Sequence, residues 1–226
     1  MKLSREEIQI IERTLLDKGV FYEDVKLELI DHIASDIENQ LENNKSNFEK
    51  AFQTVFNKWD GLLETTSSSF WLGMLFQAPK VVVDKLVSYS KRQAVIVLIL
   101  ALVFGILLAT IISDIQQEKF FYTLNLGLTG VFFLMVLATI VSLFLIWKSK
   151  VKTTYGRLFL FRGWITFVFF YQCNINGDPL YSFNVNHSLG DNFIICFLFG
   201  LEFFYSFYQI KMTLEHFEIV KKHKLV

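Results

Sequence analysis

Residues Ala94–Ser113 read AVIVLILALVFGILLATIIS, a stretch of 20 residues with no charge and no proline. An α-helix rises about 1.5 Å per residue, so this stretch is about 30 Å long, the thickness of the hydrocarbon core of a bilayer. The chain of 226 residues is 53% hydrophobic and contains 25 Phe, which is more apolar surface than a soluble domain can cover. The stretch therefore predicts a membrane-spanning helix.

Further apolar segments follow the first one. Spans are expected at about residues 94–113, 124–147, 157–172 and 192–210. Together they predict four transmembrane helices within residues 94–213, followed by a basic cytoplasmic tail over residues 214–226.

The connections between these spans differ in charge. Lys and Arg gather before the first span, between the second and third, and after the fourth, whereas Lys119 is the one cation between the first and second. Residues 173–191, between the third and fourth spans, contain no Lys or Arg. Positively charged connections stay on the cytoplasmic side of a membrane, so both termini are predicted to be cytoplasmic.

Residues 1–60 show helical periodicity and an acidic balance. Apolar side chains recur every three or four positions, and eight Lys and Arg face thirteen Asp and Glu. Ser4 and Glu7 form a capping box for a first helix, which ends at Gly19. A net negative charge repels phosphate, so nucleic acid is not expected as a partner.

Two further helices complete this N-terminal part. One is expected over about residues 22–42, and a capping box of Ser46 and Glu49 opens the other, which closes at Asp60 and Gly61. We therefore expect an all-α protein, with a small cytoplasmic three-helix bundle followed by a four-helix transmembrane bundle. About 60 residues is near the lower limit for independent folding, so the bundle is expected to lean on the membrane part or on a partner.

Residues 61–93 connect the two parts. A Ser- and Thr-rich linker over residues 61–69 is expected to lack regular structure. The segment Phe70–Phe76 is rich in aromatic residues but too short to span, so it is expected to lie at the membrane interface. Pro79 then starts a lead-in helix that continues into the first span.

Arg162 in the third span and Glu202 in the fourth are candidate functional residues, because ionisable groups inside a membrane are rare. Antiparallel neighbouring helices would place them within about 6–8 Å along the membrane normal. They predict either a proton or substrate site or a structural ion pair, and the ion pair is favoured.

A face of small residues follows the first span. Ala101, Gly105, Ala109 and Ser113 are spaced four apart, which lets another helix approach closely. Packing within the bundle is favoured, and a homodimer is the alternative.

Asp31 and His32 are the most site-like residues of the acidic part. One His with carboxylates on several helix faces is a poor metal site, so a structural or partner-docking role is expected. Cys173 and Cys196 lie near the outer ends of their spans, either as free thiols or, less favoured, as a disulfide. The polar outer loop over residues 174–191 is either a ligand site or a plain connector.

The sequence contains no motif of a known catalytic site. A nucleophile elbow, a phosphate-binding loop, HExxH and a pair of catalytic acids are all missing. We therefore assign no catalytic, cofactor-binding or metal-binding residue, and expect neither a cofactor nor an enzyme.

Part of the N-terminal region resembles a known type of module. The residues are Leu29–Glu38, LIDHIASDIE, then Phe48–Phe52, FEKAF, ending near Trp59. This pattern is similar to the HAAS-type (PadR-associated) signalling domains and permease-prefix domains of bacterial membrane proteins. The resemblance implies a cytoplasmic docking or sensing module in a multi-pass protein of the bacterial inner membrane, and it implies no catalytic residues.

Two hypotheses for function follow. The leading one is a membrane-anchored interaction or signalling protein, whose acidic head docks a cytoplasmic or membrane protein while the spans lie in the lipid bilayer. The alternative is a component of a transporter or permease that uses Arg162 and Glu202.

Overall fold

A computed structural model describes residues 2–44, 47–115, 117–174, 183 and 186–223. The chain forms two compact units. Unit 1 comprises residues 1–90, 151–157 and 218–226, and unit 2 comprises residues 91–150 and 158–217. The prediction of an all-α protein is confirmed, since strands occupy only two three-residue segments of the described chain.

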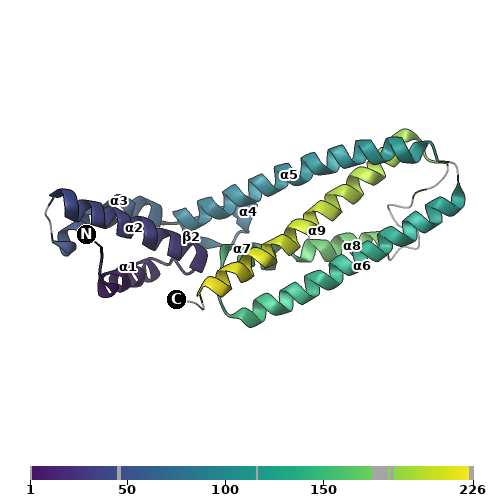
Figure 1. Cartoon of the computed structure of the whole chain (residues 1–226). Coiled ribbons are helices and arrows are strands. Elements are labelled where there is room, and N and C mark those ends of the chain that lie inside the picture. The colour runs from purple at the N-terminus through teal and green to yellow at the C-terminus, as the bar shows by residue number, and fades with distance from the viewer. Residues whose placement is uncertain (1, 45–46, 116, 175–182, 184–185, 224–226) are drawn as a thin grey trace. The chain divides into compact units, whose positions relative to one another are not determined.

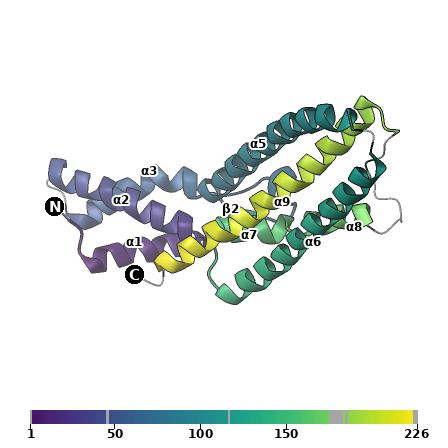
Figure 2. The same cartoon turned by 45° about the vertical axis from the view of Figure 1, so that its right-hand side comes forward.

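Unit 1 begins with three helices packed side by side, α1 (Arg5–Asp17), α2 (Glu23–Asn44) and α3 (Phe48–Leu63) (Figures 1 and 2). The Ser4–Glu7 capping box forms as predicted, and Gly19 adopts a φ of +86° after α1. Apolar residues every four positions along α2 give it one buried side, which consists of Val25, Leu29, Ile33, Ile37 and Leu41.

Two features of unit 1 differ from the predictions. The N-cap of α3 is Asn47, whose side chain accepts the backbone N–H of Lys50, so the cap lies one residue after Ser46, which is outside the described residues. The linker is also not irregular. β1 (Thr65–Ser67) pairs antiparallel with β2 (Gln77–Pro79), and the short α4 (Ser69–Leu72) lies between them. Strands of three residues are too short to show periodicity in a sequence.

Unit 1 also contains chain segments that are distant in sequence from residues 1–60. They are the β1–β2 pair, the start of α5 (Lys80–Ser113), the connection over residues 151–157 and the end of α9 (Leu189–His223). The three-helix bundle therefore packs against other parts of its own chain, which answers the small size of its core.

Three helices in the described residues are long and apolar enough to cross a membrane: α5, α6 (Glu118–Ser149) and α9. Large apolar side chains on α5 and α6 are exposed in the isolated chain, among them Ile106, Leu107, Phe133 and Leu134. Lipid would cover such a surface, so the chain is a plausible membrane protein.

The third predicted span is not one continuous helix. It consists of α7 (Thr154–Arg162) and α8 (Trp164–Asn174), which meet at Gly163. A Cβ atom on residue 163 would lie 2.9 Å from the carbonyl oxygen of Phe159, closer than real Cβ atoms approach. The backbone at this junction therefore requires glycine, which the apolar pattern alone did not indicate.

Contacts in unit 2 define the directions of its helices. Phe132 of α6 contacts Phe199 of α9, with ring centroids 5.0 Å apart. Ser149, 17 residues further along α6, contacts His216, which is 17 residues further along α9. The two helices therefore run parallel in constant register, and Figure 1 shows them pointing the same way. The chain between them must return along the length of the unit, through α7 and α8.

Candidate functional site

One side of α9 is polar and completely buried. The residues on it are each at most 5% exposed: Asn192, Glu202, Ser206, Gln209, Thr213 and His216. From Glu202 onward they are three or four positions apart, which places them on one helix face. We refer to the five residues from Glu202 to His216 as the polar face of α9. The sequence reasoning treated the spans as nearly free of polar residues, although this spacing is visible in the sequence.

Glu202 lies at the centre of this candidate site, with an exposed fraction of 0%. Arg162 is the last residue of α7, and its backbone carbonyl accepts the hydroxyl of Tyr205 at 3.1 Å. Tyr205 lies three residues after Glu202, so the end of α7 lies against the turn of α9 that carries the carboxylate. The ion pair between Arg162 and Glu202 stays a prediction.

Other helices of unit 2 present hydroxyl groups to the polar face. The hydroxyls of Thr166 on α8 and Ser206 on α9 lie 3.3 Å apart, and both residues are buried. At the end of the face, the hydroxyl of Ser149 on α6 lies 2.9 Å from Nε2 of His216. Three helices therefore meet at hydrogen-bonding side chains rather than at apolar ones.

The opposite half of unit 2 is an apolar cluster. Its buried members include Phe121, Phe132, Phe199 and Cys196, and Phe104 packs against them. Cys196 is a free, buried thiol, whereas the side chain of Cys173 lies outside the described part of the chain. The prediction of free thiols therefore has a described outcome only for Cys196.

The small residues of α5 contact α9 in the same chain. A Cβ on Gly105 would lie 3.1 Å from Cα of Phe197, and one on Gly200 would lie 3.2 Å from Cα of Ala101. Ser113 accepts the side-chain amide of Asn192 at 3.1 Å. These contacts run antiparallel along the face predicted from Ala101, Gly105, Ala109 and Ser113, and they let the two helices approach closely.

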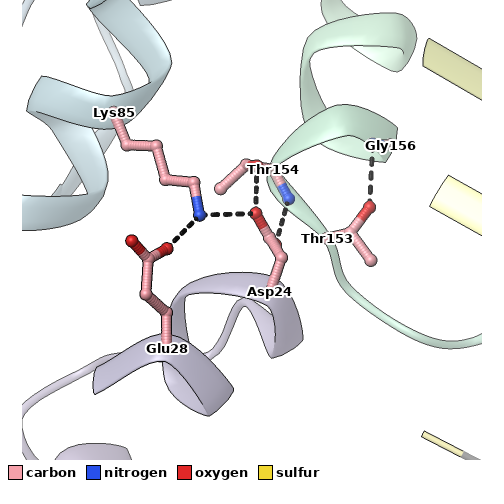
Figure 3. A network of polar contacts seen from close by, with 6 residues as sticks. All are labelled: Asp24, Glu28, Lys85, Thr153, Thr154 and Gly156. Carbon is pink, nitrogen blue, oxygen red and sulfur yellow. Dashed lines mark hydrogen bonds and ion pairs between the residues drawn. The ribbon is translucent and has the colours of Figure 1, made fainter. Parts of the chain in front are cut away.

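A second polar group, in unit 1, surrounds Asp24 of α2 (Figure 3). Its carboxylate accepts the backbone N–H of Thr154 at 2.9 Å and also the hydroxyl of Thr154. Lys85 of α5 lies 3.5 Å from the same carboxylate and 2.7 Å from Glu28. The Asp24 side chain is only 6% exposed, so it is a buried junction between α2, α5 and the segment that precedes α7.

Two pKa values are shifted close to this junction. Burial alone would lower the pKa of Lys26, but hydrogen bonds and attraction from Glu12 and Glu23 outweigh burial, and the pKa is raised. Burial raises the pKa of Tyr22, although the charge and the hydrogen bond of Arg157 oppose this effect.

Asp31 and His32 do not belong to this junction. Both side chains are exposed on α2, where a partner can reach them. The described residues contain no group of three or more His, Cys, Asp or Glu that could hold a metal ion. Most of the predicted outer loop, residues 175–182 and 184–185, lies outside the described residues.

Unit 1 has two further surface features. An open cavity of about 320 Å³ lies beside the β1–β2 pair, and its lining includes the cations Lys18 and Lys152 but no carboxylate. Between β1 and β2, the side chains of Phe70, Met74 and Leu75 are 87%, 86% and 99% exposed. This exposed apolar loop coincides with the segment predicted to lie at the membrane interface.

The comparisons with known proteins place no relative beside this chain: no family model, no curated protein and no solved structure matches it.

Proposed function

We propose that this protein is a membrane-anchored interaction and signalling protein, whose acidic head, unit 1, docks a protein partner. The junction at Asp24 is the observation that carries the proposal. One buried carboxylate joins α2 of the head to α5 and to the segment that leads into α7. A partner that shifts α2 would act directly on two segments that continue into unit 2.

The charge and exposure of the head support a docking role. Asp31 and His32 lie exposed near the middle of α2, within the segment that resembles HAAS-type and permease-prefix domains. That resemblance favours a bacterial signalling module and suggests the bacterial inner membrane as its location. The net negative charge of residues 1–60 favours a protein partner over nucleic acid.

The composition of unit 1 supports cytoplasmic termini. Residues 1–90, 151–157 and 218–226 belong to one compact unit, and the positive-inside rule assigns all three segments to the cytoplasm. A compact unit that lies outside the bilayer occupies one side of it. The parallel α6 and α9 favour four crossings, with α7 and α8 together forming the third.

The test of the docking role is capture of a partner from native membranes. The tagged full-length chain would be compared with Asp31→Ala/His32→Ala, which changes exposed side chains only. Glu49→Ala/Lys50→Ala on α3 is the matched control, since it removes an exposed acid and an exposed base elsewhere on the head. Loss of one partner in the first variant alone supports the proposal, and equal capture by all three chains refutes docking at these residues.

The second candidate function is a transporter or permease component that uses Arg162 and Glu202. The buried polar face of α9 favours it, because charged groups inside spans often mark ion or substrate pathways. Replacement of Glu202 by Gln keeps the shape of the side chain. A transporter would lose flux while it still folds, whereas an anchor would lose stability or nothing.

A further inference from the structure

The buried polar residues of unit 2 gather in the half that contains His216. The polar face of α9 covers 14 residues from Glu202 to His216, a length of about 21 Å. This length is about two thirds of a hydrocarbon core. The face therefore forms a continuous polar line from one end of the unit to Glu202.

Neighbouring helices extend this line at the same levels. The constant register of α6 and α9 sets Thr139 level with Ser206 and Ser142 level with Gln209. Thr139 and Ser142 are both buried, as are Ser206 and Gln209. Polar side chains of two helices thus occupy the same layers.

The first span contributes at one of these layers. Gly105 of α5 lies against Phe197 of α9, and the two helices run antiparallel. Twelve residues back along α5 and twelve residues on along α9, this register sets Gln93 level with Gln209. Gln93 is also buried, so a third helix adds an amide to the polar interior.

Several of these buried groups have no partner in the described residues. Both the oxygen and the nitrogen of the Gln93 amide, and the hydroxyl of Thr213, lack a hydrogen bond there. A buried polar group without a hydrogen bond costs about 1–3 kcal/mol. Water resolves this cost, because a buried water molecule makes about three hydrogen bonds to such groups. The unpaired groups therefore indicate water inside this half of unit 2.

The other half has no such line. On the far side of Glu202, α9 presents Phe199 and Cys196 to the apolar cluster, and Phe132 of α6 and Phe104 of α5 contact Phe199 there. Apolar cavities stay dry, so this cluster would block water and protons. The polar interior is therefore open in one direction only.

We propose that the polar face of α9 lines a water-filled half-channel, which brings protons from the His216 end of unit 2 to the carboxylate of Glu202. His216 and the hydroxyls along the line can pass protons through hydrogen bonds to water. The titratable groups nearest to Glu202 are Arg162 of α7 and Tyr205 of α9, since the first and second predicted spans contain no charged residue. The reaction is the binding and release of one proton, without a redox step.

This inference deepens the second candidate function, because it names the proton as what Glu202 binds. It does not require net transport. A chain in which Glu202→Gln leaves every measured flux unchanged would refute transport, while the half-channel would still be tested by the experiments below.

The first experiment measures water access by cysteine labelling. Ser206→Cys and Thr213→Cys would be made separately in full-length protein with Cys173→Ala and Cys196→Ala. Each is a small substitution, and labelling would use a charged, membrane-impermeant thiosulfonate in vesicles of both orientations. We expect labelling of both positions from the His216 side and at least a tenfold lower rate from the other side.

Two controls make this result specific. Leu214→Cys lies next to Thr213 but points outward, where its side chain is 63% exposed in the isolated chain, and lipid should protect it. The Cys173→Ala chain retains the native Cys196 inside the apolar cluster, which should stay unlabelled. Failure of both Ser206→Cys and Thr213→Cys to react, or reaction from the opposite side, would overturn the half-channel.

The second experiment asks from which side Glu202 takes its proton. Dicyclohexylcarbodiimide modifies protonated carboxyl groups in apolar surroundings, and mass spectrometry would measure its adduct on Glu202 in sealed vesicles. We expect alkaline buffer on the His216 side alone to reduce the adduct severalfold, with no change when only the other side is made alkaline. The Glu202→Gln chain identifies the site. An adduct that follows the pH of the other side, or of neither side, contradicts the proposal.

Discussion

The carboxylate of Asp24 accepts the backbone N–H of Thr154 at 2.9 Å, across 130 residues of sequence. The same carboxylate accepts the Thr154 hydroxyl and lies 3.5 Å from Lys85. Since its side chain is buried, little water can replace these contacts. The contact between head and connection is therefore specific to this carboxylate.

Removal of this carboxylate should weaken unit 1. Asp24→Ala leaves the Thr154 donors and Lys85 without their acceptor, at a cost of about 2–4 kcal/mol. Thermal unfolding in detergent and proteolysis within residues 151–157 would measure the effect. Glu28→Ala is the control, because Glu28 is exposed and should cost less than about 1 kcal/mol. Equal stability of the two variants would contradict the role given to Asp24.

Lys26 should make the stability of unit 1 sensitive to alkaline pH. Its pKa in the folded chain is raised above the ordinary 10.5, so its ion pairs stabilise the fold below pH 10.5 and are lost as pH rises through the folded pKa. The melting temperature should fall more steeply above pH 10.5 in the native chain than in Lys26→Met. Lys50→Met should keep the native slope, and a native-like slope in Lys26→Met would refute the prediction.

Gly163 should be intolerant of a side chain, whereas other glycines in spans should not be. Gly163→Ala brings a Cβ to 2.9 Å from the Phe159 carbonyl, which should destabilise unit 2 by about 1–3 kcal/mol. Gly130→Ala on α6 meets nothing within 4 Å and should change stability by less than about 1 kcal/mol. Steric unfolding assays in mild detergent would compare them, and equal effects would mean that the α7–α8 junction is not strained by a side chain.

The exposed apolar loop should insert into the headgroup region. Trp71 lies in α4 between Phe70 and Met74, so brominated lipids should quench its fluorescence in a chain whose other three Trp residues are replaced by Phe. Phe70→Ser/Met74→Ser/Leu75→Ser should reduce this quenching by at least half. Quenching that is absent in the chain with the native loop would place these side chains outside the membrane.

Reporter fusions would test the orientation of the chain. A periplasmic reporter fused after Asn184 should be active, and one fused after Lys152 should be silent, because only the connection around Lys152 is rich in cations. The reverse pattern would refute the predicted topology.

The sequence by itself determined the features that depend on near neighbours. The uncharged Ala94–Ser113 segment, the Ser4–Glu7 cap and the stop at Gly19 follow from local length, hydrogen bonding and backbone freedom. The four-residue spacing of Ala101, Gly105 and Ala109 similarly marked the face that contacts α9.

Only the tertiary structure decided which segments meet. The short β1–β2 pair, the break at Gly163 and the bond from Thr154 to Asp24 depend on contacts between distant residues, which periodicity does not encode. The polar residues of α9 were visible one by one, but as isolated groups in an apolar helix they carried little meaning. The parallel register of α6 and α9 stacks them against Thr139 and Ser142, and burial then makes each unpaired polar atom costly enough to indicate water.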